Sequence, residues 1–234
     1  MFAVKTIGAL ALAASLLAPV APAIARNGPH VAGPGSTANG LHSLNWAGYV
    51  TPGGGTSASA NWVVPSVHGA NGWSSSWVGI DGWGSDTVEQ IGTDSAVWNG
   101  AHVYYAWVEL YPAMPVILHY ASGAELPIHP GDHMSGSVRA RGDQYTIKLT
   151  DHTEGWKYAQ TILYPPGANA SAEVITEAPG EPTLPLADFG QEHFTDVHIS
   201  GHATRTIMVN HSRQAKVTVT GSQWNFTVHF KHSK

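Results

Sequence analysis

Three polar residues stand inside segments that otherwise have the composition of β-strands. Asp81 ends the segment WVGID, Gln90 lies in VEQIGT, and Glu109 lies in YYAWVELY. Strand interiors usually carry apolar, aromatic or Thr-like side chains, and a polar group that is buried without a partner costs free energy. A carboxylate can act as a general acid or base, and an amide can donate to a developing oxyanion. These three residues are therefore candidates for binding or catalysis.

Side-chain alternation sorts these residues onto faces of the expected strands. Trp77, Gly79 and Asp81 share one face, and Gln90 shares a face with Val88 and Gly92. The same rule groups Val103, Tyr105, Trp107, Glu109 and Tyr111, and further along the chain Glu173, Ile175 and Glu177. Successive side chains of a strand point to opposite faces of a sheet. Several strands are thus expected to present aromatic rings together with carboxylates or an amide.

A sheet face that gathers Trp, Tyr and acidic side chains is more typical of a binding cleft than of plain solvent surface. The alternatives are structural. Trp77 and Trp107 could belong to the core, with the two faces reversed. Asp81, which precedes Gly82, could be a turn residue, and Glu109 could be a buried acid with its own hydrogen-bond partners.

The rest of the chain predicts a framework of short strands. Residues 134–140, 145–150, 217–220 and 224–231 alternate apolar and polar side chains, and residues 60–64 form an expected strand that ends at Pro65. Turn sequences rich in Gly, Pro and Asp separate these segments, and no segment shows a sustained helical period. Many short alternating strands indicate an antiparallel β-sandwich or barrel in one domain.

The N-terminal residues are expected to be processed or to lie outside the fold. Residues 1–25 combine Lys5, an Ala/Leu-rich run and the small-residue sequence AIA, which is typical of a secretory signal peptide. Residues 26–43 are rich in Gly, Pro and Asn and are expected to be a flexible leader or a short pro-segment. The folded domain is predicted to span residues 44–234, and the protein to be secreted and monomeric, without a membrane span.

The amino-acid composition argues against nucleic acid, metal ions and cofactors as binding partners. Only 12% of the 234 residues are charged and the formal net charge is −5, which excludes the basic surface that nucleic-acid binding needs. Few charged pairs are compatible with tolerance of acid. There is no cysteine, hence no thiolate nucleophile. The chain has 14 His, but the spacings HPGDH (residues 129–133) and HFKH (residues 229–232) match no defined metal motif. We therefore expect neither a metal nor another cofactor.

Six segments together resemble the glutamic peptidases, or eqolisins, a family of secreted, acid-acting endopeptidases. The segments are NWAG (45–48), ANWVVPS (60–66), WVGIDG (77–82), QIGTD (90–94), YAWVELYP (105–112) and AEVITE (172–177). The resemblance implies a lectin-like (concanavalin A-like) antiparallel β-sandwich of two curved sheets, with protein or peptide substrates. It implies a catalytic dyad of Gln90 and Glu177, with Trp77, Asp81, Trp107, Glu109 and Tyr111 shaping the substrate cleft. The disulfides of the fungal members are absent, because the chain has no cysteine.

Two other functions fit the residues alone. A secreted glycoside hydrolase could use Glu109 and Glu177 as an acid and a nucleophile. A carbohydrate-binding sandwich without catalysis could use the Trp and Tyr rings as stacking platforms. Gln90 discriminates between these hypotheses, because only the peptidase dyad needs its amide.

Overall fold

The computed structural model describes residues 35–37, 40–43, 45–180, 184–201, 205–209 and 215–232. The predicted signal peptide lies outside these residues. The described part of the predicted leader forms two short strands, β1 (Gly35–Thr37) and β2 (Gly40–Ser43). The described residues contain strands and no helix, and therefore no helix that is long and apolar enough to cross a membrane.

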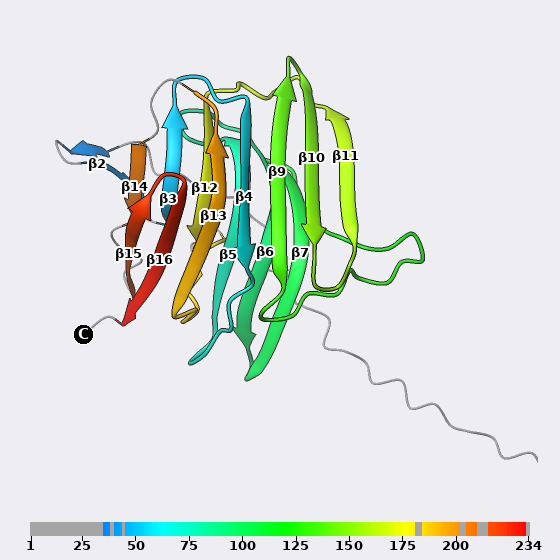
Figure 1. Cartoon of the computed structure of the whole chain (residues 1–234), viewed down its shortest axis with the longest axis vertical. Coiled ribbons are helices and arrows are strands. Elements are labelled where there is room, and N and C mark those ends of the chain that lie inside the picture. Colours follow the sequence, from blue (N-terminus) through cyan, green and yellow to red (C-terminus); the bar gives the residue numbers. More distant parts are fainter. Residues whose placement is uncertain are drawn as a thin grey trace, which may run out of the picture.

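Two sheets form the sandwich (Figure 1). Across the nine-stranded sheet the order is β1, β2, β14 (Arg205–Val209), β3 (Trp46–Pro52), β12 (Ser171–Glu177), β5 (Gly72–Asp81), β6 (Val88–Trp98), β7 (Ala101–Tyr111) and β8 (Val116–Ile117). Across the seven-stranded sheet it is β11 (Lys157–Leu163), β10 (Gln144–Asp151), β9 (His133–Arg141), β4 (Ser57–Val63), β13 (Gln191–Ile199), β16 (Asn225–His232) and β15 (Ala215–Ser222). Apart from the parallel pair β2–β14, neighbouring strands run antiparallel. The predicted all-β sandwich is confirmed.

The core lies between the two sheets. The Trp62 indole of β4 donates a hydrogen bond of 3.0 Å to the Thr93 hydroxyl of β6, and the rings of Tyr49 and Phe226 lie 4.9 Å apart across the interface. These contacts identify the inner face of the nine-stranded sheet, because Thr93 lies on it. Val78 and Ile91 share that face with Thr93 and are fully buried.

The seven-stranded sheet follows the alternation that the sequence predicts. In β9 and β10 the buried side chains, among them Met134, Val138 and Ile147, alternate with more exposed ones. One prediction within β16 is wrong. Trp224 was expected to begin that strand on its buried face, but the strand begins at Asn225 and Trp224 is 53% exposed. Trp224 belongs to the turn between β15 and β16, where the alternation does not apply.

The central strands of the nine-stranded sheet are buried on both faces. Every residue of β5 and β12 is buried, including the polar ones. The aromatic residues that the sequence assigns to a cleft face are therefore buried rather than open to solvent, with Trp77 at 0% and Trp107 at 5% exposure. They nevertheless lie on the outer face of the sheet, opposite the core, which is the face that the alternation predicted for them.

Candidate active site

The register of four adjacent strands arranges the outer face of the nine-stranded sheet in rows that run across β12, β5, β6 and β7. The first row is Glu173, Gly79, Gln90 and Glu109, the second is Ile175, Trp77, Gly92 and Trp107, and the third is Glu177, Ser75, Asp94 and Tyr105. Residues paired across strands share a face of the sheet. Acids and an amide thus occupy the first and third rows, with two Trp rings between them.

Gln90 and Glu109 form a direct hydrogen bond in the first row. The Gln90 Nε2 donates to Glu109 Oε2 at 2.7 Å, and both residues are buried. Gln90 Oε1 and Glu109 Oε1 are buried without a hydrogen-bond partner. Since buried polar atoms are normally paired, these two oxygens are suited to a water molecule or a ligand. One hydrogen of the Gln90 amide also remains for another acceptor.

Glu177 is held by two N–H donors from other strands and loops. Asn45 Nδ2 donates to Glu177 Oε1 and Trp77 Nε1 donates to Glu177 Oε2, each at 2.9 Å. Donors on both oxygens favour the ionised carboxylate. Burial is the largest influence on Glu177 and raises its pKa, and the Trp46 indole on the same side acts with Trp77 in the opposite direction. Glu177 is therefore fixed in place and supplied with the contacts that a carboxylate base needs.

Two glycines allow the Trp77 ring to reach Glu177. A Cβ atom at Gly79 would lie 2.8 Å from Trp77 Cζ3 and 3.2 Å from the Cβ of Gln90. A Cβ at Gly92 would lie 2.6 Å from the Trp77 Cβ. Both distances to Trp77 are shorter than real carbon contacts. The Trp77 ring therefore packs against the backbone of two glycines, where no side chain obstructs it. It lies between the row that contains Gln90 and the row that contains Glu177.

Asp94 organises the third row. Its carboxylate accepts hydrogen bonds from Ser75 Oγ at 2.6 Å, Tyr105 Oη at 2.7 Å and Trp107 Nε1 at 2.6 Å. The predicted cleft residue Trp107 is thereby fixed through its indole N–H. Three donors from two neighbouring strands make Asp94 a positioning residue for the aromatic side chains Tyr105 and Trp107.

Two other predicted residues lie farther from Glu177. Asp81 and Tyr111 both pair with Val88, in the row on the far side of Gln90. Asp81 has a positive φ of 74° and accepts N–H bonds from residues 168, 169 and 170, at 2.6–2.9 Å. The carbonyl oxygen of Tyr111 accepts a hydrogen bond from the Tyr164 hydroxyl at 3.0 Å. Asp81 therefore anchors a loop, and Tyr111 ties β7 to the segment that follows β11.

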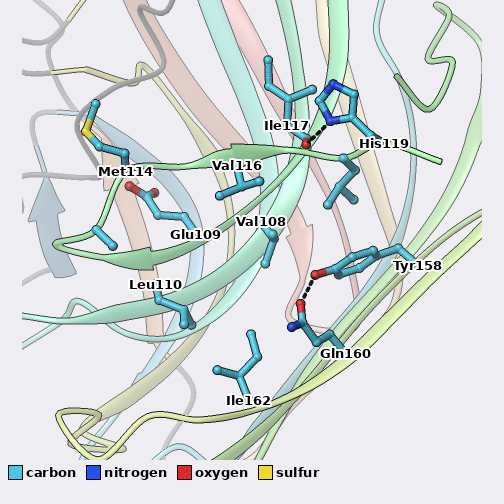
Figure 2. Close-up of a pocket in the computed structure, with 12 residues that line it drawn as sticks. Val108, Glu109, Leu110, Met114, Val116, Ile117, His119, Tyr158, Gln160 and Ile162 are labelled. Carbon is cyan, nitrogen blue, oxygen red and sulfur yellow. Dashed lines mark hydrogen bonds between the residues drawn. The ribbon is translucent and has the colours of Figure 1, made fainter. Parts of the chain in front are cut away.

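An apolar pocket of about 380 Å³ adjoins Glu109 at the edge of the sandwich (Figure 2). Val108, Met114, Val116 and Ile162 contribute to its lining. Tyr158 and Gln160 lie at one side and are hydrogen-bonded to each other. Glu109 is thus in contact with Gln90 through one oxygen and belongs to the lining of this pocket.

Comparison with known proteins identifies the family. Residues 44–233 match the sequence profile of the Peptidase A4 family. The chain belongs to the Peptidase A4 family. This glutamic peptidase is therefore a hydrolase of peptide bonds.

Solved structures agree with this assignment. A scytalido-glutamic peptidase bound to a transition-state analogue inhibitor is 25% identical, with a TM-score of 0.68 over 80% of this chain and 98% of the other. Aspergilloglutamic peptidase from Aspergillus niger is 24% identical, with a TM-score of 0.57 over 68% of this chain and 98% of its own, and shares the fold. No curated protein matches the chain significantly.

Burial dominates the electrostatics of the peptidase site. It raises the pKa of Glu109 to about 8, with the nearby charge of Asp94 as the next cause. It raises the pKa of Asp94 to about 6, against the lowering effect of its three donors. The pKa of Glu177 is raised first by burial and then by the charge of Glu109. Like charges in a buried site favour protonation, so one carboxyl group of this set holds a proton more readily than it would in water.

The sequence missed the parts of the peptidase site that act through other residues. Asn45 was quoted as part of NWAG but received no role, although its amide donates to Glu177. Asp94 and Ser75 were likewise not selected as site residues. Their signal was available, because Asp94 lies an even number of residues after Gln90, which places both side chains on one face of β6.

Proposed function

We propose that this peptidase is a secreted, acid-acting endopeptidase in which Gln90 and Glu177 form the catalytic dyad. The observation that supports this most directly is the arrangement around Glu109. This carboxyl group accepts a hydrogen bond from Gln90, and after burial its charge is the next cause of the raised pKa of Glu177. Gln90 and Glu177 also lie on the same face of the sheet. The proposed substrates are proteins or peptides, and we expect the protein to be a monomer.

In the proposed reaction Glu177 is the general base. Its carboxylate takes a proton from a water molecule, and the water oxygen attacks the carbonyl carbon of the peptide bond. The remaining N–H of the Gln90 side chain stabilises the oxyanion, while Gln90 Oε1, which has no partner, orients the water. Glu177 then returns the proton to the amide nitrogen as the C–N bond breaks. No metal or cofactor takes part.

Protonation of Glu109, whose pKa burial raises to about 8, sets the upper pH limit of this arrangement. Below that pH Glu109 holds a proton, and the charge that opposes ionisation of Glu177 is absent. Glu177 then receives the N–H bonds of Asn45 and Trp77 as a carboxylate. We expect a bell-shaped pH–rate profile, which rises as Glu177 ionises and falls as Glu109 loses its proton.

The other predicted cleft residues receive roles in keeping with their contacts. Trp77 orients Glu177, and Glu109 orients Gln90. Trp107 contributes to the substrate cleft and is positioned by Asp94. We assign Asp81 and Tyr111 to the support of the cleft at its far end. The family assignment favours this function over the glycoside hydrolase and the carbohydrate-binding module.

The test is peptide release from a denatured protein measured from about pH 3 to about pH 7, because carboxyl groups titrate from about pH 4 upwards and burial raises the pKa of Glu177. We expect Glu177→Gln to abolish release and Gln90→Ala to reduce it roughly 10²–10³-fold, as the loss of an oxyanion donor does. Glu125→Gln and Gln144→Ala, both at exposed positions, serve as matched controls with unchanged activity. Melting curves establish that each variant is folded. Full activity of a folded Glu177→Gln variant would refute the dyad.

A further inference from the structure

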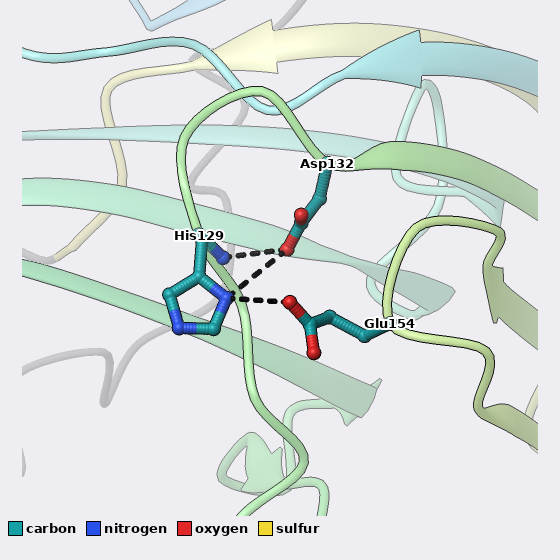
Figure 3. Close-up of side chains that lie close together, drawn as sticks. All are labelled: His129, Asp132 and Glu154. Carbon is teal, nitrogen blue, oxygen red and sulfur yellow. Dashed lines mark hydrogen bonds and ion pairs between the residues drawn. The ribbon is translucent and has the colours of Figure 1, made fainter.

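A cluster of titratable side chains lies away from the dyad, where the loop before β9 meets the turn between β10 and β11. His129 Nδ1 is 3.1 Å from Glu154 Oε1 and 3.7 Å from Asp132 Oδ2 (Figure 3). The three ligand atoms lie within 4.8 Å of one another. Asp132 is nearly buried, whereas the His129 side chain is 59% exposed. The cluster is therefore accessible from solvent on its His129 side.

A fourth carboxylate lies behind this cluster. Asp151 is fully buried, and its Oδ1 accepts the backbone N–H groups of Thr153 and Glu154 at 2.8 and 2.9 Å. Its Oδ2 is buried without a hydrogen-bond partner, and its carboxyl group neighbours that of Asp132.

The described surroundings supply little positive charge to this group. Neither Lys nor Arg forms an ion pair with Asp132, Asp151 or Glu154 in the described part of the chain. His129 is the imidazole that faces Asp132 and Glu154. The neighbouring His152 ring is hydrogen-bonded to Ser135 instead. The cluster therefore combines one imidazole with carboxyl groups, a mixed set of nitrogen and oxygen ligand atoms within 4.8 Å of one another.

We propose that His129 Nδ1, Asp132 Oδ2 and Glu154 Oε1 form a binding site for a divalent transition-metal ion such as Zn²⁺. Zn²⁺ binds nitrogen and oxygen ligands at about 2.0–2.2 Å, and a tetrahedral site then separates its ligand atoms by about 3.3–3.6 Å. The two distances from His129 Nδ1, 3.1 and 3.7 Å, lie on either side of that range. Water completes the coordination on the exposed side. Asp151 lies behind Asp132 and fixes the backbone that carries Glu154.

The ligand set distinguishes between metals. An imidazole together with carboxylates suits Zn²⁺, whereas Mg²⁺ prefers oxygen ligands and retains its water. The site is independent of the dyad, since none of its residues belongs to the outer face of the nine-stranded sheet. A bound ion would connect the loop before β9 to the β10–β11 turn, which are already joined by the bond from His133 N to Thr153 Oγ1 at 3.0 Å.

The experiment is calorimetric titration of the untagged, chelator-treated chain with ZnCl₂ at pH 7. We expect one equivalent to bind, and Glu154→Gln and His129→Asn each to weaken binding roughly tenfold or more. Glu125→Gln, which removes an exposed carboxylate elsewhere, should bind as the unmodified chain does. Mg²⁺ at the same concentration should not bind, and at pH 4 protons should displace Zn²⁺.

A melting curve of each metal-free variant separates loss of the site from loss of the fold, and both substituted ligands are at exposed positions where we expect no unfolding. Absence of zinc binding by the unmodified chain would overturn the proposal. Equal affinity in the unmodified chain and in folded Glu154→Gln would overturn it as well, because the ion would then be bound by other His residues.

Discussion

The outer faces of the two sheets of the sandwich place polar side chains in opposite environments. In β10 of the seven-stranded sheet, Lys148 is exposed to solvent between the buried residues Ile147 and Leu149. In β12 of the nine-stranded sheet, Glu173 and Glu177 alternate with Val174 and Thr176, yet all four are buried. Polar and apolar side chains thus alternate with a period of two in both strands. In β10 polar side chains such as Lys148 face solvent, whereas in β12 they form a buried layer. Chemistry is concentrated where the polar layer is buried, since burial changes the pKa values of its acids.

The largest expected difference between the sheets is in the dependence of stability on pH. Burial, followed by the charge of Asp81, raises the pKa of Glu89 from 4.5 to about 9. A carboxyl group whose pKa is raised by folding contributes its full stability below the unfolded pKa. That contribution is lost as the pH rises towards the folded pKa, at roughly 1.4 kcal/mol per unit of difference. We expect the melting temperature to fall steadily between pH 4.5 and pH 9.

Substitution of Glu89 tests this explanation. Glu89→Gln removes the ionisation, so its melting temperature should fall less than that of the unmodified chain over the same pH range. Glu125→Gln, at an exposed position, should follow the unmodified chain. If the curves of Glu89→Gln and the unmodified chain ran parallel, the buried acids would not be the cause.

The next effect concerns the donor to Glu177. Trp77→Phe retains the aromatic ring but removes the N–H that donates to Glu177 Oε2. A hydrogen bond to a charged group contributes about 1.5–3 kcal/mol, which corresponds to a loss of roughly 10–100-fold in kcat/KM. Because the lost donor stabilises the carboxylate, the acid limb of the pH–rate profile should move to higher pH. A uniform loss of rate without that shift would indicate a packing role alone.

A smaller effect on stability is expected from Gly92, which packs against the Trp77 side chain. Gly92→Ala places a Cβ 2.4 Å from the Ser76 carbonyl oxygen and 2.6 Å from the Trp77 Cβ. Overpacking of this kind costs about 1–3 kcal/mol of unfolding free energy. Denaturant titration should detect this loss, together with reduced peptidase activity. Unchanged stability would show that β5 and β6 separate more easily than their register suggests.

The smallest effect is predicted on the outer face of the seven-stranded sheet. Lys148→Ala alters an exposed side chain of β10, and such substitutions usually change stability by about 0.5 kcal/mol or less. Denaturant midpoints and peptidase activity should both match those of the unmodified chain. A loss comparable to that of Gly92→Ala would remove the contrast between the two sheets.

Alternation alone predicted the face of each side chain in β5, β6, β7 and β12, since a period of two is a local property of the strand. It did not predict that the outer face would be buried, because burial depends on segments distant in sequence. The bond from Asn45 to Glu177 spans 132 positions, and no local pattern encodes it. The cluster of His129 with Glu154 is not encoded locally either, since HPGDH places only His129 and Asp132 close together in the sequence.

The anchoring contact of Asp81 has a consequence for the dyad. Residues 168–170, which donate their N–H groups to this carboxylate, immediately precede β12. A shift of that strand by one residue would turn Glu177 into the core and bring an apolar or hydroxyl side chain to its place. Asp81 holds the three residues before β12 in place. It thereby helps to fix the register in which β12 pairs with β5. Asp81 thus helps to place Glu177 on the same face as Gln90, although it is hydrogen-bonded to the loop before β12.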